Sequence, residues 1–222
     1  MRIDMHAETS FAALYRALDR ALSLTDGRPD LRARVLSQLA RIKARDDAAA
    51  ALEAARAAVE TAGEAPGPKC GALRALALTL PPGHPERLAA LNEALRLARE
   101  ARDPLAEAGA LGNLGMLYRQ SGRPVDALEA ARRSVAQFEA AGAVWQAARS
   151  RIYLAGAAGF MQDLALVQDC ALRAMEVLEP RHDAVLYGQC LGMLALVALR
   201  GATTTPSRCC SRWRRSAAPR GS

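Results

Sequence analysis

The chain has 222 residues, of which 50 are alanine and only 9 are aromatic, and it carries a formal net charge of +7. A composition this rich in alanine and poor in aromatic residues favours helices and excludes a mainly β fold. The charge is uneven, because residues 201–222 contribute +5 and all other residues together only +2. The basic character therefore does not indicate a nucleic-acid-binding body.

Glycine and proline divide the rest of the chain into helical segments with short links. We predict helices over residues 10–25, 30–44, 48–61, 69–79, 85–101, 104–120, 124–141, 144–158, 163–178 and 183–199. Short links make sequential helices antiparallel neighbours. The segments 1–9 and 201–222 are predicted to be disordered, the second as a basic tail.

A small residue followed by an apolar one returns at spacings of 37, 36, 40 and 40 residues. The pairs are Ala21-Leu22, Ala58-Val59, Ala94-Leu95, Ser134-Val135 and Ala174-Met175. A repeat of this length built from helix pairs is typical of an α-solenoid. We therefore predict an all-α, right-handed α-solenoid of about five antiparallel helix pairs over residues 10–200.

The segment 108–142 resembles a tetratricopeptide (TPR) repeat. The resemblance rests on Leu114-Gly115, Tyr118, Gly122 at the turn and Ala127 in the second helix. We expect Leu114 and Tyr118 to pack against the partner helix. Gly115 and Ala127 are small where the two helix backbones approach each other, since a larger side chain would keep them apart.

This resemblance implies a concave groove lined by the first helix of each pair, in which a protein or peptide partner binds. Transferred to this chain, the groove residues are Asn113, Met116, Arg119, Gln120, Arg149, Tyr153, Gln189 and Met193. Asparagine and arginine there could hold the backbone or a carboxylate of an extended peptide. The alternative is a groove that is empty, or filled by the rest of a larger protein.

Catalysis is not expected. His6, His84 and His182 have no partner at catalytic spacing, and a solenoid does not bring distant repeats together. The five cysteines form neither a CxxC pair nor a Cys/His cluster, which predicts no metal or cofactor and fits a reducing cytoplasm. The most apolar run, Leu191–Leu199, is shorter than the roughly 20 residues of a membrane span. We therefore expect a cytoplasmic protein without membrane contact.

Three further interpretations remain open. The long period and the Ala/Leu/Arg-rich helices are similar to the C-terminal helical-repeat arms of large bacterial LuxR-type or ATPase signalling regulators. The chain would then be a truncated sensor arm of such a regulator, without its effector domains, and no GxxxxGK[ST] motif is present. Both ends lack a polar capping helix, so we expect self-association into dimers through them. Nucleic-acid binding would be restricted to the tail 201–222, around Trp213.

Overall fold

The computed structural model describes residues 5–178 and 183–201, and every regular element in that part of the chain is a helix. The ten helices are α1 (Met5–Ser23), α2 (Pro29–Lys43), α3 (Ala48–Ala62), α4 (Pro66–Thr79), α5 (Glu86–Glu100), α6 (Pro104–Gln120), α7 (Pro124–Ala140), α8 (Val144–Phe160), α9 (Leu164–Leu178) and α10 (Ala184–Gly201). They pack consecutively into an all-α solenoid of helix pairs, as predicted.

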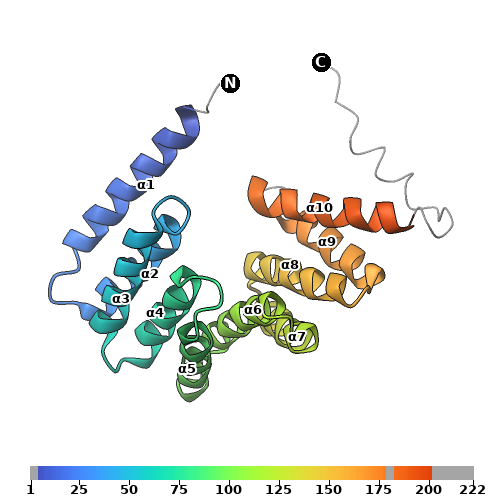
Figure 1. Cartoon of the computed structure of the whole chain (residues 1–222). Helices are drawn as coiled ribbons and strands as arrows, with labels where there is room; N and C mark the ends of the chain where they lie inside the picture. Colours follow the sequence, from blue (N-terminus) through green and yellow to red (C-terminus); the bar gives the residue numbers. More distant parts are fainter. Residues whose placement is uncertain (1–4, 179–182, 202–222) are drawn as a thin grey trace.

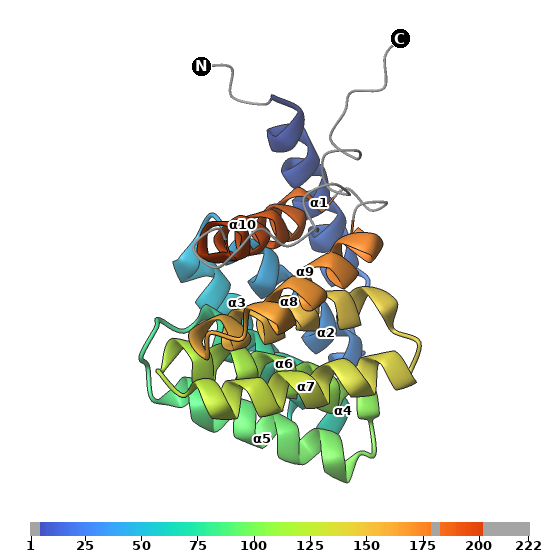
Figure 2. The ribbon, with the colours of Figure 1, turned by 90° about the vertical axis from the view of Figure 1, so that its right-hand side faces the viewer.

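The helices follow an open arc from α1 to α10 (Figure 1), and in the side view the helices from α5 to α10 lie one above another (Figure 2). Four complete pairs form it, α2/α3, α4/α5, α6/α7 and α8/α9. Each of α2, α4, α6 and α8 also contacts the next even-numbered helix. Within the described residues, no comparable contact joins α3, α5, α7 and α9 to one another. The even-numbered helices therefore lie on the inner, shorter side of the arc.

Local capping explains where the helices begin and end. Asp47 and Asp103 are N-caps, and each accepts a 2.9 Å hydrogen bond through its Oδ1, from the backbone N–H of Ala50 and Ala106 respectively. Such a cap satisfies one of the free N–H groups of the first turn. Gly142 follows α7 with φ of +66°, a backbone conformation that glycine adopts without steric cost. These boundaries confirm the sequence predictions at these positions.

Several boundaries differ from the predictions by one residue or more. Helix α1 begins at Met5, so residues 5–9, which we expected to be disordered, are helical because no glycine or proline interrupts them. Helix α4 begins at Pro66 and includes part of the predicted loop, since proline fits the first turn of a helix. Helix α10 continues to Gly201. The rest of the predicted tail, residues 202–222, lies outside the described residues.

The core is a series of small clusters rich in alanine and leucine, each shared by several neighbouring helices. The contact between α6 and α7 shows why small residues are needed. A Cβ built on Gly115 would lie 3.2 Å from the carbonyl oxygen of Ala127, which is itself fully buried. This confirms the close backbone approach predicted from the TPR-like segment. Leu114 and Tyr118 both belong to the cluster that includes Ala130 of α7.

Helix α10 differs from the others in its exposure. It contacts α8 and α9, but Leu196 and Leu199 are 58% and 70% exposed. Among the described residues it is the one helix long and apolar enough to cross a membrane, with a mean hydropathy of 1.5 over 18 residues. The apolar segment is thus longer than the run Leu191–Leu199 noted in the sequence. A single helix of this kind is weak support for membrane insertion.

Candidate functional site

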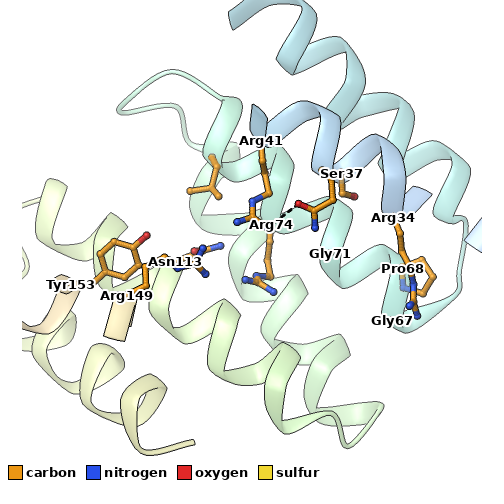
Figure 3. A pocket seen from close by; sticks show the side chains of 12 residues that line it. Arg34, Ser37, Arg41, Gly67, Pro68, Gly71, Arg74, Asn113, Arg149 and Tyr153 are labelled. Carbon is orange, nitrogen blue, oxygen red and sulfur yellow. Dashed lines mark hydrogen bonds between the residues drawn. The ribbon is translucent and has the colours of Figure 1, made fainter. Parts of the chain in front are cut away.

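The inner side of the arc contains a cavity of about 230 Å³, which we call the arginine pocket (Figure 3). Its lining residues are Arg34, Ser37, Gln38, Arg41, Gly67, Pro68, Gly71, Arg74, Leu78, Asn113, Arg149 and Tyr153. All of them belong to α2, α4, α6 and α8, the inner helices of four successive pairs. The pocket therefore forms only where several repeats stack into the arc, and no single repeat contains all of its residues.

Helical spacing explains why three of the four helices contribute a row of residues. Arg34, Gln38 and Arg41 are four and three residues apart, and therefore lie on one face of α2. Gly71, Arg74 and Leu78 follow the same pattern on α4, as do Arg149 and Tyr153 on α8. Helices α2, α4 and α8 thus each present one stripe to the pocket, and α6 contributes Asn113 alone. A Cβ built on Gly71 would meet nothing within 4 Å, so this residue leaves its side of the pocket open.

Arg41, Arg74 and Arg149 gather at one end of the pocket beside Asn113, while Arg34 lies at the other end with Gly67 and Pro68 (Figure 3). Among the described residues, no carboxylate, histidine or cysteine lines the cavity. None of the four arginines forms an ion pair within the described part of the chain. The pocket therefore concentrates positive charge without a counter-charge.

Burial and the neighbouring positive charges lower the pKa of two of these arginines. Burial lowers the pKa of Arg74 to about 10, and the positive charges of Arg149 and Arg41 act in the same direction. Burial also lowers the pKa of Arg41, again with a contribution from Arg149. Both guanidiniums nevertheless stay protonated at neutral pH. The fold thus holds Arg41 and Arg74 in positions where their charged forms are disfavoured.

Three buried donors in the pocket have no hydrogen-bond partner in the part of the chain that the structure describes: Nε of Arg74, Nδ2 of Asn113 and Nε of Arg149. Asn113 is only 3% exposed, so its amide cannot turn to bulk water. A buried donor without an acceptor costs roughly 1–3 kcal/mol. These donors come from α4, α6 and α8, and a ligand with several acceptor atoms would satisfy them.

Few contacts within the protein hold these side chains. The guanidinium of Arg149 lies over the ring of Trp145, with its Cζ 5.4 Å from the ring centroid. Arg41 donates a long 3.5 Å hydrogen bond through one terminal nitrogen to Oε1 of Gln38 (Figure 3). The guanidinium of Arg74 lies against Gly109 of α6. These contacts orient the guanidiniums without neutralising their charge.

The predicted groove residues separate into two sets. Asn113, Arg149 and Tyr153 line the arginine pocket, and the other five do not. On α6, Met116 is half-buried, Gln120 is exposed, and Arg119 packs across Gly156 of α8. On α10, Gln189 is exposed, whereas Met193 packs against the buried clusters around α8 and α9. Whether these residues bind a partner stays a prediction.

Sequence reasoning missed Arg34, Arg41 and Arg74. The regular spacing of Arg34 and Arg41 on a predicted helix was visible, but it resembles a solvated helix face. Arg74 stands within the apolar run from Ala72 to Leu78, and a charge in such a run was the available signal.

The cysteines and the potential metal ligands of the described residues lie outside the arginine pocket. The described residues contain no group of three or more side chains suited to hold a metal ion. Cys70, Cys170 and Cys190 are free and buried. Burial raises the pKa of Cys170 and that of Cys190 to about 11, so both thiols are neutral at physiological pH.

No model of a known protein family matches the sequence, and no curated protein matches it. Among solved structures, the chain is similar to the crystal structure of BtubC (BKLC) from P. vanneervenii, a helical protein. The TM-score is 0.55 at 16% sequence identity, and the match covers 92% of this chain and 96% of that one. At this identity the likeness concerns the fold alone, and it extends over almost the whole arc.

Proposed function

We propose that the chain is a non-catalytic protein-interaction module, which binds an extended segment of a partner protein along the inner side of its arc. The observation that carries this proposal is the convergence of side chains from four successive inner helices on one pocket. Solenoids use such continuous concave surfaces to bind extended partners. The solenoid fold, shared with BtubC, supports an interaction scaffold.

We further propose that the repeats are of the TPR type. The support comes from α6 and α7, where Gly115 and Ala127 meet at the point at which a TPR pair requires small residues. In that type the first helix of each pair lines the groove. Helices α2, α4, α6 and α8 hold this position here, and they supply all the residues of the arginine pocket.

The composition of the arginine pocket supports binding over catalysis. General acid–base chemistry needs a group that exchanges a proton near neutral pH, such as histidine or a carboxylate. The lining residues include neither, and arginine keeps its proton throughout that range. The pocket residues are therefore suited to hold a ligand and not to transform it.

The test is selection of peptides from a random display library with the full chain. Selected peptides should lose about tenfold or more in affinity, measured by fluorescence anisotropy, on the double substitution Met116→Ala with Gln120→Ala. These positions follow Asn113 on the same face of α6 but lie outside the pocket lining. Substitution of the exposed Arg56 of α3 by Ala is the control and should change nothing.

A second variant, with residues 202–222 deleted, separates groove binding from tail binding and should bind as the full chain does. The proposal is wrong if no selected peptide responds to the α6 double variant. It is equally wrong if the deletion abolishes binding.

A further inference from the structure

We propose that the arginine pocket receives a phosphate group carried by a side chain of the bound segment. The proposal rests on the proposed function, because it assumes that a protein segment lies along the inner side of the arc. It adds the chemical class of the group that the pocket recognises. Three properties of the pocket lead to it: its charge, the arrangement of its free donors and its size.

Charge is the first property. Arg41, Arg74 and Arg149 lie together without a carboxylate in the lining, and Arg34 adds a fourth positive charge at the other end. A single carboxylate would compensate one of these charges. A phosphorylated side chain carries a charge of about −1.5 to −2 at neutral pH and so compensates more of the cluster. Arginine clusters are a recurrent means of recognising phosphorylated segments.

The free donors are the second property. The three buried donors without partners, on Arg74, Asn113 and Arg149, come from three different helices. A phosphate group offers three strong acceptor oxygens in a non-planar arrangement, whereas a carboxylate offers two in a plane. Donors that approach from α4, α6 and α8 therefore match the phosphate better. Asn113 is 3% exposed and its Nδ2 has no acceptor among residues 5–178 and 183–201, so the donor set is built into the fold.

Size is the third property. The cavity of about 230 Å³ is smaller than the pockets of about 300–1,000 Å³ that enclose whole drug-sized ligands. It has ample room for one oxyanion and several waters, since one water occupies about 30 Å³ of liquid. The pocket thus fits a single charged group with the rest of the ligand outside, which is the geometry of a side chain presented by a peptide.

The distribution of charge favours a peptide over a nucleic acid. Binding along a nucleic-acid backbone requires a stripe of cations that contacts several phosphates. Outside residues 201–222 the chain has a net charge of only +2, and many arginines on the outer helices pair with carboxylates, as Arg96 does with Glu93. Three cations without an ion pair in the described residues, Arg41, Arg74 and Arg149, are gathered at one end of the pocket, which suits one phosphate.

The experiment measures binding to the full chain by calorimetry and by the shift in melting temperature, at constant ionic strength. The probes are inorganic phosphate, sulfate, and blocked pentapeptides of alanine whose central residue is phosphoserine, glutamate or serine. We expect inorganic phosphate and the phosphoserine peptide to bind and to raise the melting temperature by at least about 2 °C. The phosphoserine peptide should bind at least as tightly as the free ion, and the glutamate peptide about tenfold or more weakly than the phosphoserine peptide.

Variants assign the binding to the pocket. Arg74→Met and Arg149→Met should each weaken phosphoserine binding by about tenfold or more, and Arg149→Lys should not restore it, because lysine lacks the planar fork of donors. Arg56→Met, on the exposed face of α3, removes the same charge outside the pocket and should leave the affinity unchanged. Circular dichroism confirms that each variant is folded. Equal losses in Arg56→Met and Arg74→Met would show non-specific charge attraction and overturn the proposal.

A pH comparison identifies the charge state of the ligand. The second pKa of a phosphate group is about 6, so its affinity should fall between pH about 7.5 and about 5.5, whereas sulfate, whose charge is constant, should not change. The charged or titratable groups around Arg74 are Arg41, Arg149, Tyr153 and Cys70, and none of these types ordinarily titrates in that interval. A parallel fall for sulfate would contradict the proposal.

The remaining outcomes distinguish a failure of the phosphate proposal from a failure of the proposed interaction function. If library-selected peptides respond to the α6 double variant but none of the phosphate probes binds, the phosphate assignment fails and the interaction function stands. If the glutamate peptide binds as tightly as the phosphoserine peptide, the pocket selects a carboxylate and the assignment fails. If the free ion binds and the phosphoserine peptide does not, the pocket is a site for a small anion and a peptide does not supply its ligand.

Discussion

The guanidinium of Arg74, from α4, occupies the space in which a side chain at position 109 of α6 would lie. A Cβ built on Gly109 would overlap the guanidinium carbon and both terminal nitrogens of Arg74. The missing side chain at position 109 is therefore what lets a largely buried cation lie between two inner helices. Helix α6 includes Gly109, Gly112 and Gly115, and each of them makes room for a different neighbour.

The substitution Gly109→Ala is expected to displace Arg74 and to weaken the response to phosphate. Alanine favours the helix by about 1 kcal/mol over glycine, and the flexible end of Arg74 can move away, so the variant should stay folded. The shift of the melting temperature caused by phosphate should fall to less than half. Gly188→Ala in α10 is the control, since a Cβ there meets nothing within 4 Å. An unchanged phosphate response in Gly109→Ala contradicts the role assigned to Arg74.

Arg74→Met is expected to stabilise the ligand-free protein. The substitution keeps an unbranched apolar stem and removes a guanidinium whose pKa is lowered to about 10 by burial and by neighbouring arginines. Each kcal/mol gained should raise the melting temperature by about 2–4 °C in a chain of this length. Thermal unfolding in chloride buffer, followed by circular dichroism, measures this. A lower melting temperature would show that the guanidinium is stabilising where it lies.

Ser134→Ala is expected to destabilise the junction of α6, α7 and α8 by about 1–3 kcal/mol. The Ser134 hydroxyl donates to the carbonyl oxygen of Ala108 at 2.7 Å, and Oγ of Ser150 lies 2.9 Å away. Because Ser134 has one hydroxyl proton, Ser150 must be the donor in the second bond. Both residues are at most 1% exposed, so the substitution removes the acceptor of the Ser150 hydroxyl and takes one of its two hydrogen bonds from the helical carbonyl of Ala108.

Urea unfolding of the two single serine variants and of the double variant tests this network. Ser150→Ala alone should cost less, because Ser134 keeps its bond to Ala108. The double variant should lose less than the sum of the two single variants. Additive losses would mean that the two hydroxyls do not depend on each other.

The buried thiols predict a loss of stability at alkaline pH. In the folded protein the pKa of Cys170 and that of Cys190 are about 11, against an ordinary value of 9.0. Between these values the unfolded chain releases protons that the folded chain retains, so the free energy of unfolding falls as pH rises from 9.0 to about 11. The double variant Cys170→Ala with Cys190→Ala should show a smaller fall. Urea unfolding at several pH values gives both slopes, and equal slopes would disprove the assignment.

Helix α10 predicts self-association of the chain. Its exposed Leu196 and Leu199 form part of an apolar surface of the kind that drives association. The double substitution Leu196→Glu with Leu199→Glu should lower the average mass measured by light scattering after size exclusion. Val125→Glu on α7, at a position that is 63% exposed, is the matched control. If the unsubstituted chain elutes as a monomer, the expectation is wrong.

Local features of the fold could be predicted from the sequence. Proline, glycine and N-cap aspartates act within one turn, so α6, bounded by Asp103-Pro104 and Ser121-Gly122, begins and ends where expected. The small residues Gly115 and Ala127 similarly indicated a close helix contact. Errors arose where a helix had no strong breaker, as at Met5, or began at a proline that resembled a loop, as at Pro66.

The pocket could be predicted only in part, because its geometry is not local. Asn113, Arg149 and Tyr153 were found through their position on first helices. Arg41 and Arg74 were missed, since nothing in a single helix shows that α2 and α8 reach the same cavity. The convergence of α2 and α8 on one cavity depends on the rotations between all the successive helix pairs. Short-range sequence patterns do not encode these rotations.

Arg41 and Arg149 line the same cavity, so the distance between them depends on the curvature of the arc. These residues belong to α2 and α8, with two inner helices between them, so their separation changes with every small rotation of one repeat against the next. An anion bound to both arginines would connect α2 to α8 and would make the arc of repeats more rigid. Conversely, tension on the two ends that straightened the arc would separate Arg41 from Arg149 and release the anion.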